Sequence, residues 1–298
     1  MSLRNTGYYL AGIGFLALAK AKNILQGYSS PKPFDISDTE RCIKYDIDVV
    51  EHWLHHLEKY TQSANFLHGK NVLELGPGSD FGVGIYLISK GCSRYNACDA
   101  NDLMKSTPAS FYNKFFEALK LLNNQVDIDS LRSDVRSARA GHSSRLNYVV
   151  RDDFNLICAF GKTTVDLVFS QAAFEHFDAI NETVSQLSSV CKPGAILVAE
   201  IDLKTHSRWI RDKDPNNIYR YSSHVYNTFW FRGIPNRIRP FQYKDALERS
   251  GWKDISITPL TLLNDAGSRD PCTNKVFSDP KNQMDYLSIM LCATKSAT

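Results

Sequence analysis

The chain has 298 residues, of which 43% are hydrophobic, and its formal net charge is +3. This composition supplies a large core and excludes a disordered chain, and so mild a charge does not favour a nucleic-acid partner. The seven cysteines are scattered without a C-x-x-C pair. Their pattern disfavours a disulfide framework and predicts a cytoplasmic protein.

The first predicted element is the apolar run YYLAGIGFLALA at residues 8–19, which lies between Arg4 and the pair Lys20 and Lys22. The run is too short to span a membrane, which takes about 20 apolar residues. Three interpretations stay open. The run is a buried helix or cap over the domain, a helix in the interface of the inner membrane face, or a signal peptide with a cleavage site after residues 17–19.

A linker with two prolines follows at residues 29–36, and the sequence SDTE then supplies a helix start. Apolar residues recur every three or four positions as far as Tyr60, which predicts an amphipathic helix. We therefore expect residues 1–62 to form an N-terminal helical cap and residues 63–298 to form the main domain.

Short apolar runs alternate with helical patterns in the main domain. Strands are predicted at 71–75, 94–99, 146–151, 165–170 and 195–201, helices at 82–90, 108–122 and 178–191, and then a helix closed by Gly251 and strands at 253–260 and 284–295. This alternation predicts an α/β fold with a Rossmann-like, mostly parallel sheet of seven strands covered on both faces.

Two insertions are longer than a minimal crossover, at residues 102–145 and 202–240. Long insertions in a compact domain are often functional. The second is rich in Arg, Tyr, Trp and Asn, which suits ligand contact better than packing. Its aromatic residues could form a sugar or lipid platform or could equally be core: Tyr219, Tyr221, Tyr226, Phe229 and Trp230.

The stretch NVLELGPGSDFGVG places Glu74 at the end of the first strand, and Gly76 and Gly78 in the turn that follows. Such glycines usually allow a ligand to approach the backbone closely. A dinucleotide turn would have a third glycine where Phe81 stands, and Glu74 would repel a pyrophosphate. A cofactor with cationic groups and no phosphate fits better, and S-adenosylmethionine carries an ammonium and a sulfonium.

The stretch VLELGPGSD resembles the first motif of class I S-adenosylmethionine-dependent methyltransferases, E/D-x-G-x-G-x-G. This resemblance implies S-adenosyl-L-methionine as the cofactor, held at Glu74, Gly76 and Gly78. The sequence departs from the motif at Asp80, which replaces the third glycine. The departure puts in doubt the floor beneath the methionine part of the cofactor.

Four further segments resemble the same family in the same order. YNACDA implies that Asp99 binds the ribose hydroxyls, and VVRDDF implies that Asp152 contacts adenine, with Asp153 as a competitor. VDLVFSQAAFEHF resembles the segment around the cofactor and the reacting centre, and so implies contacts from Ser170 and Gln171. VCKPGAILVAEID resembles the turn before the fifth strand.

Later segments, including AEIDLKTHSRW and IPNRIRP, resemble a little-characterised bacterial group of these enzymes that often accompanies glycan assembly. The resemblance implies a small or glycan-linked acceptor. Asn236, Arg237 and Arg239 are expected to bind an anionic group of that acceptor, because guanidinium groups suit phosphate and carboxylate. The alternative is that these arginines lie on a solvated loop.

Methyl transfer from a sulfonium is an in-line displacement that needs alignment and, for a hydroxyl acceptor, removal of a proton. We expect no metal, since the histidines at 52 and 56 lack a third ligand. The favoured base for O-methylation is His206 oriented by Asp202, with His176 as a competing base or a packing residue. The rivals are C- or N-methylation without a base, and a non-catalytic scaffold that retains the cofactor fold.

Overall fold

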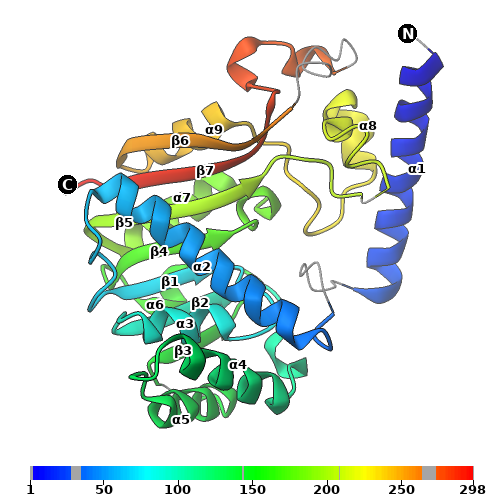
Figure 1. The fold of residues 1–298 in the computed structure, drawn as a ribbon. Coiled ribbons are helices and arrows are strands. Elements are labelled where there is room, and N and C mark those ends of the chain that lie inside the picture. Colours follow the sequence, from blue (N-terminus) through cyan, green and yellow to red (C-terminus); the bar gives the residue numbers. More distant parts are fainter. Residues whose placement is uncertain (1–2, 28–34, 143, 208, 264–272, 298) are drawn as a thin grey trace.

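The protein is described by a computed structural model that covers residues 3–27, 35–142, 144–207, 209–263 and 273–297. Its centre is a seven-stranded sheet with the order β3-β2-β1-β4-β5-β7-β6 (Figure 1). The strands are β1 (Asn71–Leu75), β2 (Arg94–Asp99), β3 (Leu146–Val150), β4 (Val165–Gln171), β5 (Cys191–Asp202), β6 (Trp252–Leu262) and β7 (Tyr286–Lys295). Only β7 runs antiparallel to its neighbours, so the predicted α/β class and mostly parallel sheet are confirmed.

Helices cover both faces of the sheet (Figure 1). The helices are α1 (Leu3–Gln26), α2 (Thr39–Thr61), α3 (Gly82–Ser89), α4 (Ala109–Leu122), α5 (Ile128–Arg139), α6 (Leu156–Phe160), α7 (Ile180–Val190), α8 (Ser223–Thr228) and α9 (Pro240–Arg249), with 3₁₀ turns η1 (Met104–Ser106), η2 (Phe174–His176), η3 (Asn217–Arg220), η4 (Lys275–Phe277) and η5 (Pro280–Asn282). Helices α2 to α5 share one core with the sheet, and α6, α7 and α9 share the other. Most of the linker predicted at residues 29–36 lies outside the described residues.

The strand order reverses next to β1. The chain passes from β1 outward to β2 and β3, and then returns to β4 on the other side of β1. In an open α/β sheet, ligands bind beyond the carboxyl ends of the strands at such a switch point. A ligand site is therefore expected at the turns that follow β1 and β4.

Helix α2 is an integral layer of the domain. The Trp53 ring is fully buried and stacks on the Phe169 ring of β4, with ring centroids 4.7 Å apart and an interplanar angle of 4°. The amphipathic stripe predicted from the sequence is the face that packs on the sheet. Helix α2, which the sequence grouped with α1 in an N-terminal cap, thus covers the sheet alongside α3.

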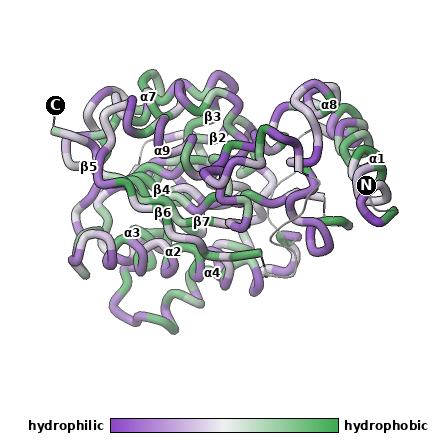
Figure 2. Tube along the Cα trace, turned by 90° about the horizontal axis from the view of Figure 1, so that it is seen from above, coloured by the Kyte–Doolittle hydropathy of each residue, from purple (hydrophilic) through white to green (hydrophobic). Residues whose placement is uncertain are grey.

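Helix α1 lies apart from the sheet, beside α8 at one edge of the molecule (Figures 1 and 2). Gly12 lets it approach the second insertion, since a Cβ there would stand 2.0 Å from the side-chain oxygens of Asn217 and Tyr221. These two side chains donate hydrogen bonds to the backbone oxygens of Tyr8 and Tyr9. Helix α1 thus docks on the insertion by backbone contacts, and no described helix is long and apolar enough to cross a membrane.

The two insertions are largely packing elements. Residues 102–145 contain α4 and α5, which extend the core beside β2 and β3. In residues 202–240 the rings of Tyr219, Tyr221 and Tyr226 are buried together against α1, whereas the Trp230 side chain is about half exposed. Of the two alternatives that the sequence left open for those three tyrosines, the structure supports the core.

Candidate active site

A cavity of about 540 Å³ opens at the switch point, beyond the carboxyl ends of β1 and β4. Its volume is typical of small-molecule and cofactor sites, which span about 300–1,000 Å³. Seven segments of the chain form its wall: Asn23; Tyr45, Asp46 and Val49; Glu74, Gly76, Pro77, Gly78 and Val83; Asp99 to Asn101; Asp152 to Phe154; Gln171 to Ala173, His176 to Ala179, Glu182, Thr183 and Gln186; and Arg232 and Gly233.

The turn after β1 is shaped by two glycines in the left-handed region, Gly76 at φ +72° and Gly78 at φ +78°. Side chains other than glycine pay about 1–2 kcal/mol for this conformation. A Cβ on Gly76 would stand 2.7 Å from the Cβ of Ala173, so that glycine lets two turns pack together. A Cβ on Gly78 would meet no atom within 4 Å, so Gly78 leaves open the space that the cavity occupies.

Glu74 and Asp80 flank this turn and have different roles. Glu74 lines the cavity while one of its carboxylate oxygens accepts a 2.5 Å hydrogen bond from the buried Tyr95 hydroxyl. Asp80 is buried outside the wall, and its carboxylate accepts the backbone N–H of Gly82 at the start of α3. Asp80, which replaces the third glycine of the motif, therefore holds the backbone at the start of α3 and does not line the cavity.

Asp99 lies in the wall at the end of β2 and is almost completely buried. Burial raises the pKa of its carboxyl to about 6, and hydrogen bonds from the backbone of Asn101, Gly78 and Ala100 oppose the rise. The carboxylate is therefore costly to keep charged in the absence of a ligand. Ligand hydroxyl groups that donate to it would offset that cost.

The two adjacent acids after β3 are distinguished by Arg151. Its guanidinium donates two hydrogen bonds, of 2.8 and 2.6 Å, to the carboxylate of Asp153 and lowers the pKa of that carboxyl to about 2. Asp152 also lines the cavity, and its carboxylate has no ion-pair partner among the described residues. Asp152 is thus the better placed of the two for an adenine contact.

Ser170 and Gln171 lie at the end of β4, and both were expected to contact the cofactor, but the structure places them differently. Gln171 lines the cavity, and its side-chain oxygen is buried there without a hydrogen-bond partner in the described chain. Ser170 is fully buried and donates a 3.1 Å hydrogen bond to the backbone oxygen of Leu75. The structure therefore does not support a cofactor contact by Ser170, which ties β4 to β1.

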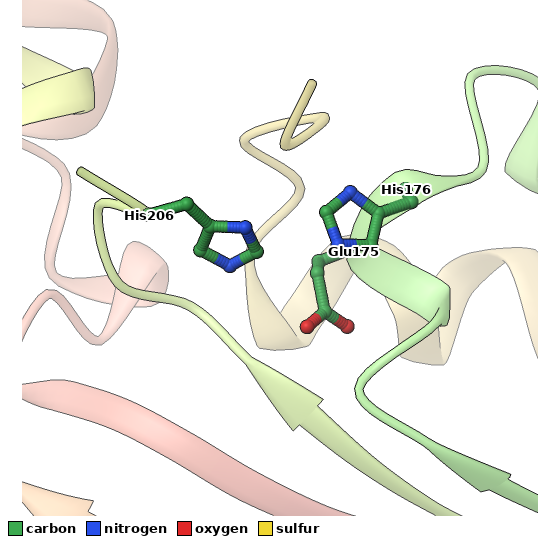
Figure 3. Close-up of side chains that lie close together, drawn as sticks. All are labelled: Glu175, His176 and His206. Carbon is green, nitrogen blue, oxygen red and sulfur yellow. The ribbon is translucent and has the colours of Figure 1, made fainter. Parts of the chain in front are cut away.

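Three titratable side chains converge behind this wall, at η2 and in the segment after β5 (Figure 3). The His176 and His206 ring centroids are 4.9 Å apart, and the Glu175 carboxylate lies beside both rings. Burial lowers the pKa of His176, lowers that of His206 to about 3 and raises that of Glu175. Of the three, only His176 lines the cavity.

The structure does not support the predicted base pair of Asp202 and His206. The Nε2 atom of His206 is 3.8 Å from the nearer carboxylate oxygen of Asp202, which is too long for a hydrogen bond. That oxygen accepts from the guanidinium of Arg211, and the other accepts the backbone N–H of Lys204. His206 is therefore neither oriented by Asp202 nor part of the cavity wall, while His176 stands in the wall.

The expected anion grip by two arginines is also not supported, because both are used inside the protein. Arg237 is 9% exposed, donates to the backbone oxygens of Ile218 and Tyr221, and lies 4.2 Å over the Tyr226 ring. Arg239 is fully buried. Its guanidinium donates to the backbone oxygens of Asn282, Gln283 and Tyr286 and to the hydroxyl of Tyr219.

Asn236 fixes the loop that carries His176 and has no place in the cavity wall. Its side-chain amide donates to the backbone oxygens of Phe174 and Phe177, and its backbone N–H donates to that of Glu175 at 2.7 Å. The amide oxygen accepts the backbone N–H of Ile238. Asn236 therefore positions η2, and the structure does not support acceptor binding by this residue.

Sequence reasoning missed the contribution of the N-terminal helices. Tyr45, Asp46 and Val49 of α2 and Asn23 of α1 all line the cavity. Asp46 is 1% exposed, and a Cβ on Gly82 would stand 2.1 Å from its carboxylate. A signal was present, because this acid falls on the apolar stripe of the predicted helix, where a charged residue needs a reason.

The cavity wall fits a cofactor with cationic groups and ribose hydroxyls. Carboxylates of Glu74 and Asp99 stand at the ends of adjacent strands, the amide oxygen of Gln171 has no partner, and Gly78 leaves the turn open. Each is a hydrogen-bond acceptor or an open approach to the backbone. A pyrophosphate would instead meet repulsion from the two carboxylates.

Comparisons with known proteins give one family match. Residues 73–199 match the model of a family described as "Methyltransferase domain", and no curated protein matches the chain. Among solved structures, a methyltransferase of Mesorhizobium loti is 14% identical with a TM-score of 0.43, covering 77% of this chain and 92% of that one. One of Archaeoglobus fulgidus is 15% identical with a TM-score of 0.44, covering 83% and 94%.

The phosphoethanolamine N-methyltransferase 2 of Haemonchus contortus, in complex with S-adenosyl-L-methionine, is 14% identical with a TM-score of 0.45, covering 83% of this chain and 52% of that one. Likeness to solved structures at this level carries no information on the acceptor. The family match and the strand order together define the class. The chain contains a class I S-adenosylmethionine-dependent methyltransferase domain, and its methyl donor is S-adenosyl-L-methionine.

A side chain at Gly78 should block the cofactor. We expect Gly78→Val to weaken S-adenosylhomocysteine binding by about 10- to 100-fold, because filling an occupied space costs about 1–3 kcal/mol. The matched control is Gly141→Val, which imposes the same left-handed strain at φ +74° on an exposed turn. Calorimetry on both variants separates the two effects, and equal losses of affinity would contradict a cofactor at Gly78.

Cofactor affinity should fall as the pH drops through the pKa of Asp99. The ionised carboxylate accepts ribose hydroxyls, and its pKa of about 6 means that it is mostly charged at pH 7 and mostly protonated at pH 5. We expect S-adenosylhomocysteine to bind about tenfold more weakly at pH 5 than at pH 7. Asp99→Asn should bind weakly at both pH values, and an unchanged pH step in that variant would exclude Asp99 as the source.

Proposed function

We propose that this methyltransferase O-methylates a small or glycan-linked acceptor. The observation that carries the proposal is the position of His176, which is the one imidazole among the described residues of the cavity wall. It follows β4 at the switch point, and its Nδ1 atom is buried without a hydrogen-bond partner in the described chain. Burial lowers its pKa, so the ring is neutral at pH 7.

A hydroxyl acceptor requires two events at this wall. The acceptor oxygen forms a bond to the methyl carbon as the carbon–sulfur bond breaks, and the electron pair of that bond stays on sulfur to give S-adenosylhomocysteine. The hydroxyl proton must leave at the same time or before, and in this proposal the unpartnered Nδ1 atom of His176 accepts it. Gln171 and Ala173, beside it in the wall, limit how the acceptor can approach.

One observation favours a second candidate, N-methylation of an amine. Seven described residues of the wall carry carboxylates, whereas Arg232 is the only lysine or arginine among them. Such a wall attracts a cationic acceptor and repels a phosphate or carboxylate group. It suits neutral sugars and amines, and it weighs against the anionic acceptor first expected from Arg237 and Arg239.

His176→Ala should reduce the rate of O-methylation by about 10²–10⁴-fold, the usual contribution of assisted proton removal, while S-adenosylhomocysteine affinity changes little. The assay uses methyl-deuterated S-adenosylmethionine with a panel of neutral sugars and amino sugars, and mass spectrometry locates the label. The control is His55→Ala, an exposed residue of α2 outside the wall. A labelled methylamine would select the second candidate, and a labelled carbon would exclude both.

We also propose that α1 rests on a membrane surface through its outer face. Leu3, Leu10, Leu18 and Leu25 repeat at helical spacing on that face and are between 61% and 94% exposed. The helix has no acidic residue, and its apolar stretch is largely green in Figure 2. Basic residues beside an apolar face are typical of helices in the interface of anionic membranes.

The test is sedimentation with vesicles of phosphatidylglycerol and phosphatidylcholine. We expect the double change Leu10→Asp and Leu18→Asp to reduce binding at least about tenfold, because burying each leucine is worth about 1.5–3 kcal/mol. The control is Leu121→Asp with Leu122→Asp, which alters two exposed leucines of α4. Equal binding by all three proteins, or no binding by any, would refute the proposal.

A further inference from the structure

The side chains of Glu175, His176 and His206 form a cluster whose geometry the fold holds in place. Each offers a ligand atom, and these atoms lie within 4.8 Å of one another. Figure 3 shows the two imidazole rings next to each other, in an edge-to-face arrangement, with the Glu175 carboxylate beside them. The segments that bring them together are η2 and the chain after β5, which meet next to the cavity.

The polar atoms of this cluster are poorly satisfied. Glu175 is 2% exposed, and neither carboxylate oxygen has a hydrogen-bond partner of normal geometry in the described chain. Only the backbone amides of Glu175 and Asp202 lie near enough to oppose the rise of its pKa. Nδ1 of His176 and Nε2 of His206 are likewise buried and unpartnered among the described residues. A buried polar group without a partner costs about 1–3 kcal/mol, so four such atoms side by side need an explanation.

We propose that Glu175, His176 and His206 bind a divalent transition-metal ion. Two imidazoles and one carboxylate are a common donor set for Zn²⁺ and for Fe²⁺. Bonds of about 2.1 Å to a central ion place ligand atoms about 3.0–3.5 Å from one another, so ligand atoms now up to 4.8 Å apart must approach by about 1.3–1.8 Å at most. Side-chain rotation can supply that movement.

The charges around the cluster support a cation. Among the described residues, two basic side chains act on His206, namely Arg211, which is paired with the Asp202 carboxylate, and the partly exposed Lys204. Asp202 itself lies 3.8 Å from His206, and the carboxylates of Asp202 and Glu200 both act on Glu175. A cation would neutralise part of the charge of this group of acids.

The role of the ion in the reaction rests on the proposed O-methylation. His176 belongs both to the cluster and to the cavity wall, so a bound ion lies next to the acceptor space. A metal ion lowers the pKa of a bound water from 15.7 to about 7, and it acts in the same sense on a bound hydroxyl. The acceptor proton would then leave to solvent without a free imidazole base.

The experiment is calorimetric titration of the full chain with Zn²⁺ after treatment with a chelator. We expect one ion per chain. Loss of an outer-shell partner weakens metal binding by about 10- to 100-fold, and Glu175→Gln and His206→Ala, which remove ligands, should each weaken it by more. Glu175→Gln removes a buried carboxylate that lacks partners, so its metal-free melting temperature should be equal or higher. Lost binding in that variant is then not lost folding.

The control removes the other histidine pair, by His52→Ala with His56→Ala on α2. These partly exposed rings are 4.8 Å apart, and His52 lies 3.2 Å from Glu200, so they are the natural place for surface zinc. The control should keep its ion. Binding that survives Glu175→Gln and His206→Ala, or that is lost only in the control, overturns the metal site.

If the protein O-methylates an acceptor but binds no metal, the proposed function is supported and the metal site is refuted. If the protein binds the metal but methylates only amines or carbons, the metal site is supported and O-methylation is refuted. The two proposals therefore fail separately.

Discussion

The site depends on the turn between β1 and α3, where the backbone takes a conformation that favours glycine. Gly76 allows this turn to pack against the loop after β4, and Gly78 leaves the space beyond it open. Because the strand order reverses next to β1, the same turn faces the ends of β2 and β4. The acids and amide of the wall are arranged around that opening.

The wall is acidic, and this property governs what it can bind. Carboxylates that are buried, such as Asp99 and Glu74, cost free energy while no ligand shares their charge. A cofactor that brings an ammonium, a sulfonium and hydroxyl donors removes part of that cost. The same acids restrict the acceptor, since a phosphate would be repelled from a wall in which Arg232 is the only lysine or arginine described. Cofactor and acceptor selection are thus two consequences of one charge distribution.

The sequence was sufficient for the fold because strands and helices alternate with clear periodicity, and the turn residues between them are distinctive. It also located Glu74, Gly78, Asp99, Asp152 and Gln171, all of which lie in the cavity wall. Those residues lie at the carboxyl ends of strands or just after them, and the carboxyl ends of parallel strands meet at one edge whatever the details of the loops.

The roles of residues in the insertions could not be predicted, because arginine and asparagine serve packing and binding equally well. Arg239 was expected to bind an anion, yet its guanidinium donates to three backbone oxygens and to the Tyr219 hydroxyl in the interior. The partnership of Glu175 with His206 was equally hidden, since the two are far apart in the chain and meet only through the fold. The place of Asp46 in the wall was hidden in the same way, because α2 is distant in sequence from the strand ends and reaches them only through the fold.

The most direct test of this account is a crystal structure of the protein with S-adenosylhomocysteine. The account predicts a ribose whose hydroxyls bond to the carboxylate of Asp99, with the methionine part over the Gly76–Gly78 turn and the sulfur turned toward His176. A ligand bound elsewhere, or one in this cavity with its sulfur turned away from His176, would contradict it.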